Sequence, residues 1–327
     1  MKKSGKTRAP RNRTLSLTDE DRRRLDRRLL SLHKPANASE LINTTICADL
    51  FSVLPHLPAG TFDLVFADPP YNLDKVFGKN AFQKTGIDEY ETWLSTWLPE
   101  MHRLLTPNGS IYVCGDWRSS PALYRVLEKH FRIKNRITWQ REKGRGAKKN
   151  WKNSHEDIWF AVKSPTYTFH TEAVKIRKRV IAPYRESGKP KDWEESDDGN
   201  VRMTHPSNLW TDLTVPFWSM PENTEHPTQK PEKLLAKILL ASTRENDIVF
   251  DPFLGAGTTS VTARKLGRRY CGVESDRTYC LLAERRLELA ETDPEIQGYT
   301  DGIFWERNTL LRQKQRKKKQ QENTLDF

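Results

Sequence analysis

The chain alternates short apolar runs with longer stretches in which apolar residues recur every three or four positions. Runs of strand length occupy residues 44–47, 62–67, 110–114, 136–139 and 157–162. Helical spacing extends from Tyr90 to Leu105, where Pro99 is expected to kink or split the helix, and a second helix is predicted over residues 121–130. Strands that alternate with helices in this way predict a doubly wound α/β domain, with helices on the faces of a mostly parallel sheet.

The same alternation returns in the last third of the chain. A helix is predicted after Pro231, and strands are predicted at residues 247–250 and 269–273. A helix follows each of these two strands, and the last one covers roughly residues 277–290. The second regular region therefore extends the sheet that the first one begins.

An irregular segment at residues 164–222 separates the two regular regions. It shows little periodicity and contains many Pro, Gly, Trp and charged residues. Because it is too long to be a plain loop, we expect an insertion that handles a substrate. Some packing of its own is predicted through Trp193, Trp210 and Trp218.

The balance of charge favours a polyanionic partner. Lys and Arg number 55 against 43 Asp and Glu, a net charge of +12. Nucleic acid is the first candidate, and a merely soluble basic protein is the alternative. The four cysteines form no C-x-x-C pair and the eight histidines show no metal-ligand spacing. The charged N-terminus and the lack of any apolar run of transmembrane length predict a soluble intracellular protein that does not enter a membrane.

Basic residues concentrate in both terminal segments. Residues 1–35 are rich in Arg and Lys, and a helix is expected to begin near Thr18. A solvated tail with a surface helix explains this arm as well as contact with DNA does. The other end carries a basic run that is expected to be disordered and to add nonspecific DNA affinity: Arg312, Lys314, Arg316, Lys317, Lys318 and Lys319.

A third basic segment interrupts the regular pattern at residues 141–152. It carries two glycines, an aromatic ring and a single acid among its basic residues. Basic side chains with an aromatic among them suit phosphate contact and base stacking, so nucleic-acid contact is preferred here over a solvated loop. The candidate contact residues are Lys143, Arg145, Lys148, Lys149, Trp151 and Lys152.

The first chemical motif is Asp68-Pro69-Pro70-Tyr71, which directly follows the apolar run at residues 62–67. The two prolines fix the backbone and remove two donors, so the motif forms a stiff shelf at the end of a strand. A carboxylate, free carbonyls and an aromatic ring together suit a planar group that carries an amine. A simple strand-ending turn is the alternative. The polar residues 72–88 that follow are expected to form a mobile lid.

The second motif lies at residues 247–274 and combines a strand, a glycine loop, a helix, a strand and an acid. Glycines allow a ligand to approach the backbone, and Glu274 at the end of the second strand suits ribose hydroxyls. The loop Gly255-Ala256-Gly257 lacks both the dinucleotide G-x-G-x-x-G pattern and the G-K-[ST] of a phosphate loop. A nucleoside derivative without a pyrophosphate is therefore predicted, and S-adenosyl-L-methionine fits.

Together the motifs resemble those of the DNA amino-methyltransferases that modify N6 of adenine or N4 of cytosine. Phe66 to Asn72 match the catalytic motif of that family, His226 to Pro231 match the stretch before the cofactor strand, and Asp251 to Thr259 match the cofactor loop. The target-amine motif precedes the cofactor motif, which is the circularly permuted, β-type order. The resemblance spans roughly residues 40–290 and implies the fold of S-adenosylmethionine-dependent methyltransferases, with DNA as the substrate.

The resemblance also assigns roles to individual residues. The Asp68 carboxylate and the Pro69 carbonyl would accept the two amine hydrogens, Pro70 would stiffen the shelf, and Tyr71 would stack on a base flipped out of the duplex. Cofactor contacts are implied for Asp49, Lys230, Asp251, Phe253, Gly255, Gly257, Thr258 and Glu274. Asp49 could instead be a helix cap, Lys230 a surface charge and Thr258 a cap only.

Asp68 at the first motif position favours N6 of adenine, because Ser is commoner there in the N4-cytosine enzymes of this family. An N4-cytosine enzyme is the runner-up. An RNA methyltransferase and an inactive DNA-binding homologue are further alternatives.

The resemblance also implies where and with whom the protein works. A basic arm (1–35), a methyltransferase domain (36–295) and a basic tail (296–327) are predicted, with residues 141–222 of the domain forming a target-recognition insertion. The expected location is the cytoplasm. A cognate restriction endonuclease and a homodimer are the partners it suggests besides DNA.

Overall fold

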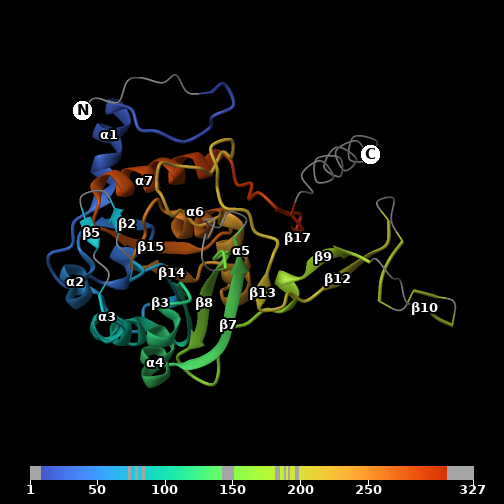
Figure 1. Ribbon diagram of the computed structural model, residues 1–327. Coiled ribbons are helices and arrows are strands. Elements are labelled where there is room, and N and C mark those ends of the chain that lie inside the picture. The colour runs from blue at the N-terminus through green and yellow to red at the C-terminus, as the bar shows by residue number, and fades with distance from the viewer. Residues whose placement is uncertain are drawn as a thin grey trace.

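The computed structural model describes residues 9–72, 75–77, 80–82, 85–141, 151–180, 185–187, 189–190, 192–195 and 199–307. A nine-stranded sheet forms the centre (Figure 1). Its strands, in spatial order, are β1 (Leu29–Leu30), β2 (Thr44–Cys47), β15 (Arg269–Glu274), β14 (Ile248–Asp251), β3 (Phe62–Ala67), β6 (Leu105–Gly115), β8 (His155–Val162), β7 (Arg132–Gln140) and β13 (Leu209–Trp210). All neighbours pair in parallel except β6 with β8 and β8 with β7. The predicted doubly wound, mostly parallel sheet is confirmed.

Helices cover both faces of this sheet (Figure 1). On one face lie α2 (Leu50–Val53), α3 (Ile87–Leu104) and α4 (Ser120–His130), and on the other lie α5 (Glu232–Ser242), α6 (Thr258–Lys265) and α7 (Arg277–Thr292). Each set closes its own apolar core against the strands. Short 3-10 turns, η1 (Asp26–Arg28), η2 (Ala38–Leu41), η3 (Leu54–His56) and η4 (Glu172–Val174), lie in the connections.

The long helix α3 runs without a break through Pro99. Of the kink or split predicted at Pro99, the split is therefore wrong. A proline inside a helix removes one backbone hydrogen bond, which here would go to the carbonyl of Ser95. The apolar face on both sides of Pro99 is fully buried and keeps the helix on the sheet: Leu94, Trp97, Leu98, Met101 and Leu104.

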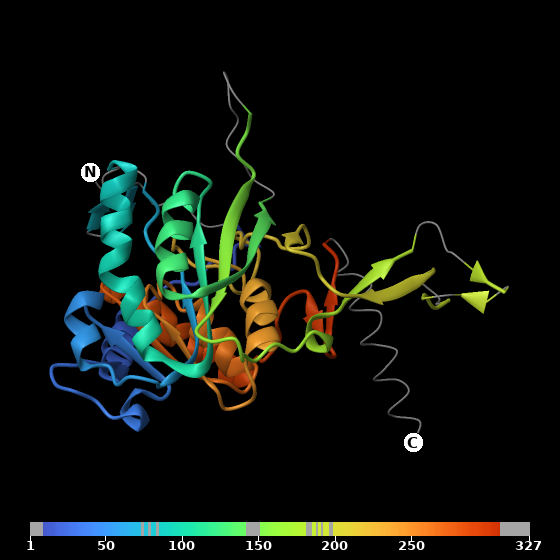
Figure 2. The same ribbon diagram turned by 90° about the horizontal axis from the view of Figure 1, so that it is seen from below.

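A second, four-stranded sheet extends to one side of the central one (Figure 2). Its order is β12 (Val201–Thr204), β9 (Ile176–Arg179), β17 (Ile303–Trp305) and β16 (Tyr299–Thr300). The small pairs β4 (Lys75–Phe77) with β5 (Asn80–Phe82) and β10 (Arg185–Glu186) with β11 (Lys189–Pro190) lie outside both sheets. Strand β17 pairs in parallel with β9, so a segment predicted to belong to the basic tail completes the sheet of the insertion.

The three tryptophans that were expected to pack the insertion do not behave alike. Trp193 and Trp210 are buried, but Trp218 is half exposed. Trp210 joins the core of the central sheet, because β13 pairs with β7 at its edge. The prediction is thus wrong for Trp218, and Trp210 fastens the insertion to the domain.

A buried ion cluster joins the insertion, helix α5 and β17. Both carboxylate oxygens of Asp212 are paired, with Lys233 Nζ at 2.7 Å and Lys237 Nζ at 2.5 Å. Lys233 also donates to the backbone carbonyl of Trp305 in β17. The side chain of Lys237 is 1% exposed, so this cluster is enclosed by protein on all sides.

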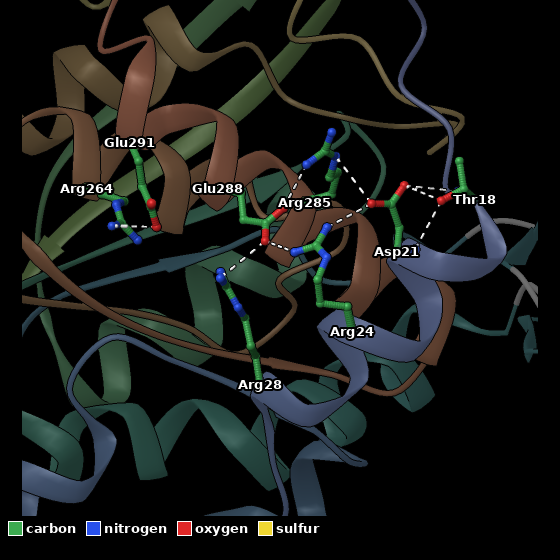
Figure 3. Close-up of polar contacts among 8 residues, drawn as sticks. All are labelled: Thr18, Asp21, Arg24, Arg28, Arg264, Arg285, Glu288 and Glu291. Atoms are coloured by element: carbon green, nitrogen blue, oxygen red, sulfur yellow. Dashed lines mark hydrogen bonds and ion pairs between the residues drawn. The ribbon is translucent and has the colours of Figure 1, made fainter.

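The described part of the basic arm is docked on the domain. Helix α1 (Asp19–Leu25) begins with a capping box between Thr18 and Asp21, which confirms the predicted helix start. On the surface of α7, Glu288 pairs with both Arg24 and Arg28 (Figure 3). These two arginines are therefore occupied by an acid of the domain.

Two further points concern sequence predictions. In the described part of the chain, no helix combines the length and apolar character needed to cross a bilayer. The basic tail from Arg312 to Lys319 lies outside the described residues.

Candidate active site

The connections that leave two neighbouring strands of the central sheet, β3 and β14, lead in opposite directions. From β3 the chain passes through α3 to β6 on one side, and from β14 it passes through α6 to β15 on the other. In an open α/β sheet, a crevice forms at the carboxyl ends of two strands whose connections diverge in this way. Asp68 directly follows β3 and Asp251 ends β14, so both predicted motifs meet at this crevice.

The shelf after β3 is held by two hydroxyl groups. Tyr90 of α3 donates its hydroxyl to the Pro70 carbonyl at 3.1 Å. The Tyr71 hydroxyl lies 3.0 Å from Asp68 Oδ1 and 3.1 Å from Glu156 Oε2. Burial, with the Asp68 charge beside it, raises the pKa of Tyr71, so this hydroxyl keeps its proton and donates it. The motif is thus fixed from both of its ends.

Four charged side chains, two of them buried, form a network under the shelf. Lys230 Nζ lies 2.6 Å from Asp68 Oδ2 and 3.5 Å from Glu156 Oε2. Arg141 pairs with the other carboxylate oxygen of Glu156. The side chains of Lys230 and Glu156 are only 7% and 8% exposed, whereas Asp68 is 18% exposed. Asp68 is thus the acid of the network that lies nearest to solvent.

The charges in this network hold one another ionised. Burial alone favours the neutral form of Glu156, but Lys230 and Arg141 outweigh it and keep the pKa of Glu156 below its usual value. Burial likewise opposes the charge on Lys230, yet the carboxylates of Asp68 and Glu156 raise the pKa of Lys230. These shifts keep Glu156 and Lys230 in their charged forms at neutral pH.

The glycine loop turns the chain from β14 into α6. Gly255 and Gly257 both have positive φ, +55° and +79°, and Gly257 is the N-cap of α6. A Cβ on Gly257 would lie 2.5 Å from the Cβ of Ala283, so only glycine lets α6 approach α7 this closely. A Cβ on Gly255 would lie 3.0 Å from His226 Nε2. The loop thus packs closely against α7 at Gly257 and against His226 at Gly255.

Two acids brace this loop. Asp251 accepts hydrogen bonds from Thr259 Oγ1 at 2.6 Å and from the Phe253 backbone at 2.9 Å. Glu274, at the end of β15, accepts from the backbone of Gly255 at 2.9 Å and of Asp276 at 2.7 Å. Burial raises the pKa of Glu274 and raises that of Asp251 to about 7.

A pocket opens between the shelf and the loop. Its lining includes Asp68, Lys230, Asp251, Phe253, Gly255 and Thr258, which were all predicted from sequence, together with Phe66, His226, Thr228, Gln229, Leu254, Ala256 and Thr259. Three acids, Asp68, Asp251 and Glu274, lie in or beside it, and they suit a ligand that carries positive charge. The glycine in the pocket wall and these acids fit a nucleoside sulfonium such as S-adenosyl-L-methionine.

The other predicted cofactor residue, Asp49, lies farther along the crevice. It follows β2, which pairs with β15 so that Cys47 lies opposite Glu274. Its carboxylate caps α2 by accepting from the Phe51 backbone at 2.9 Å, and the residue is exposed. Thr258 donates its hydroxyl to the Lys230 carbonyl at 3.1 Å and accepts from Arg286, so it joins the glycine loop to the segment that carries Lys230.

Of the predicted nucleic-acid contacts, two lie within the described residues. Trp151 is 94% exposed, and Lys152 beside it is also exposed. They stand just before β8, the strand that carries Glu156 into the site. Lys143, Arg145, Lys148 and Lys149 lie outside the described residues.

Sequence reasoning missed Glu156 and its partner Arg141. The signal was an acid pair, Glu156 and Asp157, at the start of an otherwise apolar strand. Successive side chains in a strand point to opposite faces of the sheet, so Glu156 and Asp157 must lie on different faces. In a mostly buried strand, a pair of acids indicates partners supplied from elsewhere in the fold.

Substitution of Asp251 by Asn is expected to flatten the dependence of stability on pH. The pKa of Asp251 is raised from 3.8 to about 7. Between these values only the folded protein holds the proton, so the wild-type free energy of unfolding falls as pH rises and levels off above about 7. From pH 5 to 8 this group should contribute a loss of about 2–3 kcal/mol.

Urea unfolding of both proteins at pH 5, 6, 7 and 8 measures this effect. The difference in stability between the Asn variant and wild type should grow in favour of the variant across the series. Parallel curves would show that Asp251 does not ionise in this range.

Comparisons with known proteins agree on one family. The family model for DNA methylase matches residues 62–285. The DNA adenine methyltransferase YhdJ of Escherichia coli is 34% identical over 264 residues, covering 79% of this chain and 86% of that protein. The type II methyltransferase M.HpaI of Haemophilus parainfluenzae is 31% identical, with 78% and 75% covered. A Thermus thermophilus structure described as a DNA modification methylase complexed with S-adenosyl-L-methionine has a similar fold, with a TM-score of 0.51, 20% identity and coverage of 81% and 98%.

Proposed function

Because the chain belongs to the DNA methylase family, we propose that it transfers a methyl group from S-adenosyl-L-methionine to the N6 amine of adenine in duplex DNA. One observation supports this more than any other. Asp68 stands at the point where the connections of the sheet diverge, in the same pocket as the glycine loop and Asp251. A carboxylate that accepts an amine and a site for a cationic nucleoside therefore share one crevice.

The pocket residues have the chemistry to hold the methyl donor, which supplies the methyl group when bound. Gly255 lines the pocket and lets it approach the backbone, while Gly257 shapes the loop by letting α6 pack on α7. Phe253 offers a ring that is held edge-on by Trp97 at 5.0 Å. Glu274 suits the ribose hydroxyls and Asp251 a positive charge. Asp49 would reach the adenine amine from the end of β2, and Thr258 would fix the loop against Lys230.

The chemistry at the shelf follows from hydrogen bonding. The exocyclic amine of adenine is a poor nucleophile because its lone pair is delocalised into the ring. The Asp68 carboxylate and the Pro69 carbonyl would accept its two hydrogens and direct the lone pair at the methyl group. Tyr71 would stack on the flipped base and Pro70 keeps the shelf rigid, since its carbonyl is held by Tyr90.

Adenine is preferred over cytosine as the target base. The curated relative YhdJ is a DNA adenine methyltransferase, and Asp68 occupies the motif position where this family favours Asp for adenine. The family as a whole includes N4-cytosine enzymes, so N4 of cytosine remains the second candidate.

The DNA would meet the protein at the edge that carries Trp151 and Lys152. We assign target recognition to residues 141–222 and include Lys143, Arg145, Lys148 and Lys149 among the phosphate contacts. The division into a basic arm (1–35), a catalytic domain (36–295) and a basic tail (296–327) is part of this proposal. So are a cytoplasmic location, a cognate restriction endonuclease and a homodimer.

Methyl transfer from labelled S-adenosyl-L-methionine to duplex DNA, followed by nucleoside analysis, tests the proposal. Labelled N6-methyladenine is the expected product. Labelled N4-methylcytosine would keep the chemistry and overturn the base. Labelled RNA without labelled DNA would overturn the substrate, and no label on either would overturn the activity.

A further inference from the structure

Glu156 contacts three groups of the active-site network although it lies far from both motifs in sequence. Its Oε2 atom accepts from the Tyr71 hydroxyl at 3.1 Å and lies 3.5 Å from Lys230 Nζ. Its Oε1 atom pairs with Arg141. The Glu156 side chain is 8% exposed, and it makes these contacts from strand β8 of the central sheet.

We propose that Glu156 is a positioning residue that shares Lys230 with Asp68 and thereby preserves the negative charge of the shelf. The inference rests on the proposed function, because it concerns how Asp68 meets an amine. Lys230 is 2.6 Å from Asp68 and 3.5 Å from Glu156, so its charge is divided between two acids. Without Glu156, the whole charge of Lys230 would fall on Asp68.

The charge balance explains why this matters for the reaction. Methyl transfer forms a carbon–nitrogen bond while the carbon–sulfur bond of the sulfonium breaks and leaves a neutral thioether. The amine nitrogen then carries the positive charge until it releases one of its protons to Asp68 or to water. A negative Asp68 stabilises that developing charge, and a Lys230 neutralised only by Asp68 opposes it. With Glu156 present, two acids face two bases, and the network is neutral around the shelf. Loss of Glu156 leaves an excess positive charge beside the place where positive charge develops.

The second effect concerns Tyr71. Its one hydroxyl proton lies within reach of both Asp68 at 3.0 Å and Glu156 at 3.1 Å. Either acid can accept this proton, so the hydroxyl end of the ring that is proposed to stack on the base is held between them. Glu156 thus orients the ring and balances the charge from one position.

The chain contains a matched control in the next residue. Asp157 is equally buried but faces the other side of the strand, where it accepts from Ser120 at 2.9 Å and Thr138 at 3.3 Å. None of these contacts involves the site. A buried acid in the same strand can therefore be neutralised without touching the network.

The test compares methyl transfer by wild type, Glu156→Gln and Asp157→Asn, each also made in a Lys230→Met background. Glu156→Gln should lower kcat about 10- to 100-fold with little change in KM for DNA. In the Lys230→Met background the same change should alter kcat by less than about threefold, because the charge that Glu156 shares with Asp68 is gone and only its pair with Arg141 is left. Asp157→Asn should leave kcat unchanged in both backgrounds.

Two kinetic results would overturn the proposal. One is a normal kcat in Glu156→Gln, and the other is an equal loss in both backgrounds, which would show that Glu156 does not act through Lys230. Thermal unfolding of each variant identifies any that fail to fold, and Glu156→Asp, which restores the charge, should recover part of kcat where Gln does not.

A readout without activity separates this inference from the proposed function. In protein labelled with 15N-lysine, the Nζ resonance of Lys230 is identified by its loss in Lys230→Met. It should shift in Glu156→Gln and stay in place in Asp157→Asn. An unchanged resonance in Glu156→Gln would overturn the shared ion pair, whereas a wild type that methylates nothing while this shift is present would overturn the proposed function alone.

Discussion

Replacing Asp68 by Asn is expected to lower the rate of methyl transfer by about 10³-fold while the protein stays folded. Asparagine keeps the shape and one acceptor oxygen for Lys230, which lies 2.6 Å away, but removes the negative charge. The amine would then face a shelf that no longer stabilises positive charge. Single-turnover rates with labelled S-adenosyl-L-methionine measure the effect on the chemical step.

Binding of the methyl donor supplies the control for this variant. Asp68 lines the pocket together with Gly255 and Asp251, but the loop is braced by Glu274 and Thr259 rather than by Asp68. The dissociation constant for S-adenosyl-L-methionine, measured by calorimetry, should therefore change much less than the rate. A variant that binds the donor and still transfers methyl groups at a near-normal rate would remove Asp68 from the mechanism.

Replacing Asp212 by Ala is expected to destabilise the protein by about 3–5 kcal/mol. Asp212 is the counter-charge shared by Lys233 and Lys237, whose side chains are 7% and 1% exposed. Truncating the acid leaves two buried ammonium groups without their counter-charge, and burial already lowers the pKa of Lys237 to about 8. Urea unfolding at pH 7 measures the loss.

An exposed ion pair in the same insertion gives the matched control. Asp192 pairs with Arg202 at 3.1 Å, and both side chains are about half exposed. Replacing Asp192 by Ala should lower the free energy of unfolding by less than about 1 kcal/mol, because solvent screens such exposed pairs. If both variants lost equal stability, burial of the Asp212 cluster would not explain its effect.

The order of strands and helices was predictable because each buried strand is a short apolar run and each helix has a continuous apolar face. The two motifs were also found, since Asp68 and the loop at Gly255 follow directly from strands. The continuity of α3 was not, because its buried face outweighs the bond lost at Pro99. Local propensity predicts an element well only where tertiary packing does not override it.

Contacts between distant segments were the part that sequence could not supply. Glu156 lies 88 positions from Asp68 and 74 from Lys230, by the sequence numbering, and no spacing rule joins them. The same holds for β17, whose three residues look like part of a tail until they pair with β9. Glu156 and β17 each depend on a partner that is distant in sequence and that only the folded chain brings near.

The pairing of β17 with β9 has a consequence for the engineering of new target sites. A designer who exchanges residues 141–222 between relatives would cut the second sheet in two, because one of its inner strands comes from residues 303–305. The ion pairs of Asp212 with Lys233 and Lys237 cross the same seam. A working chimera must therefore carry two separate pieces of chain, the insertion and the strand that follows the last helix.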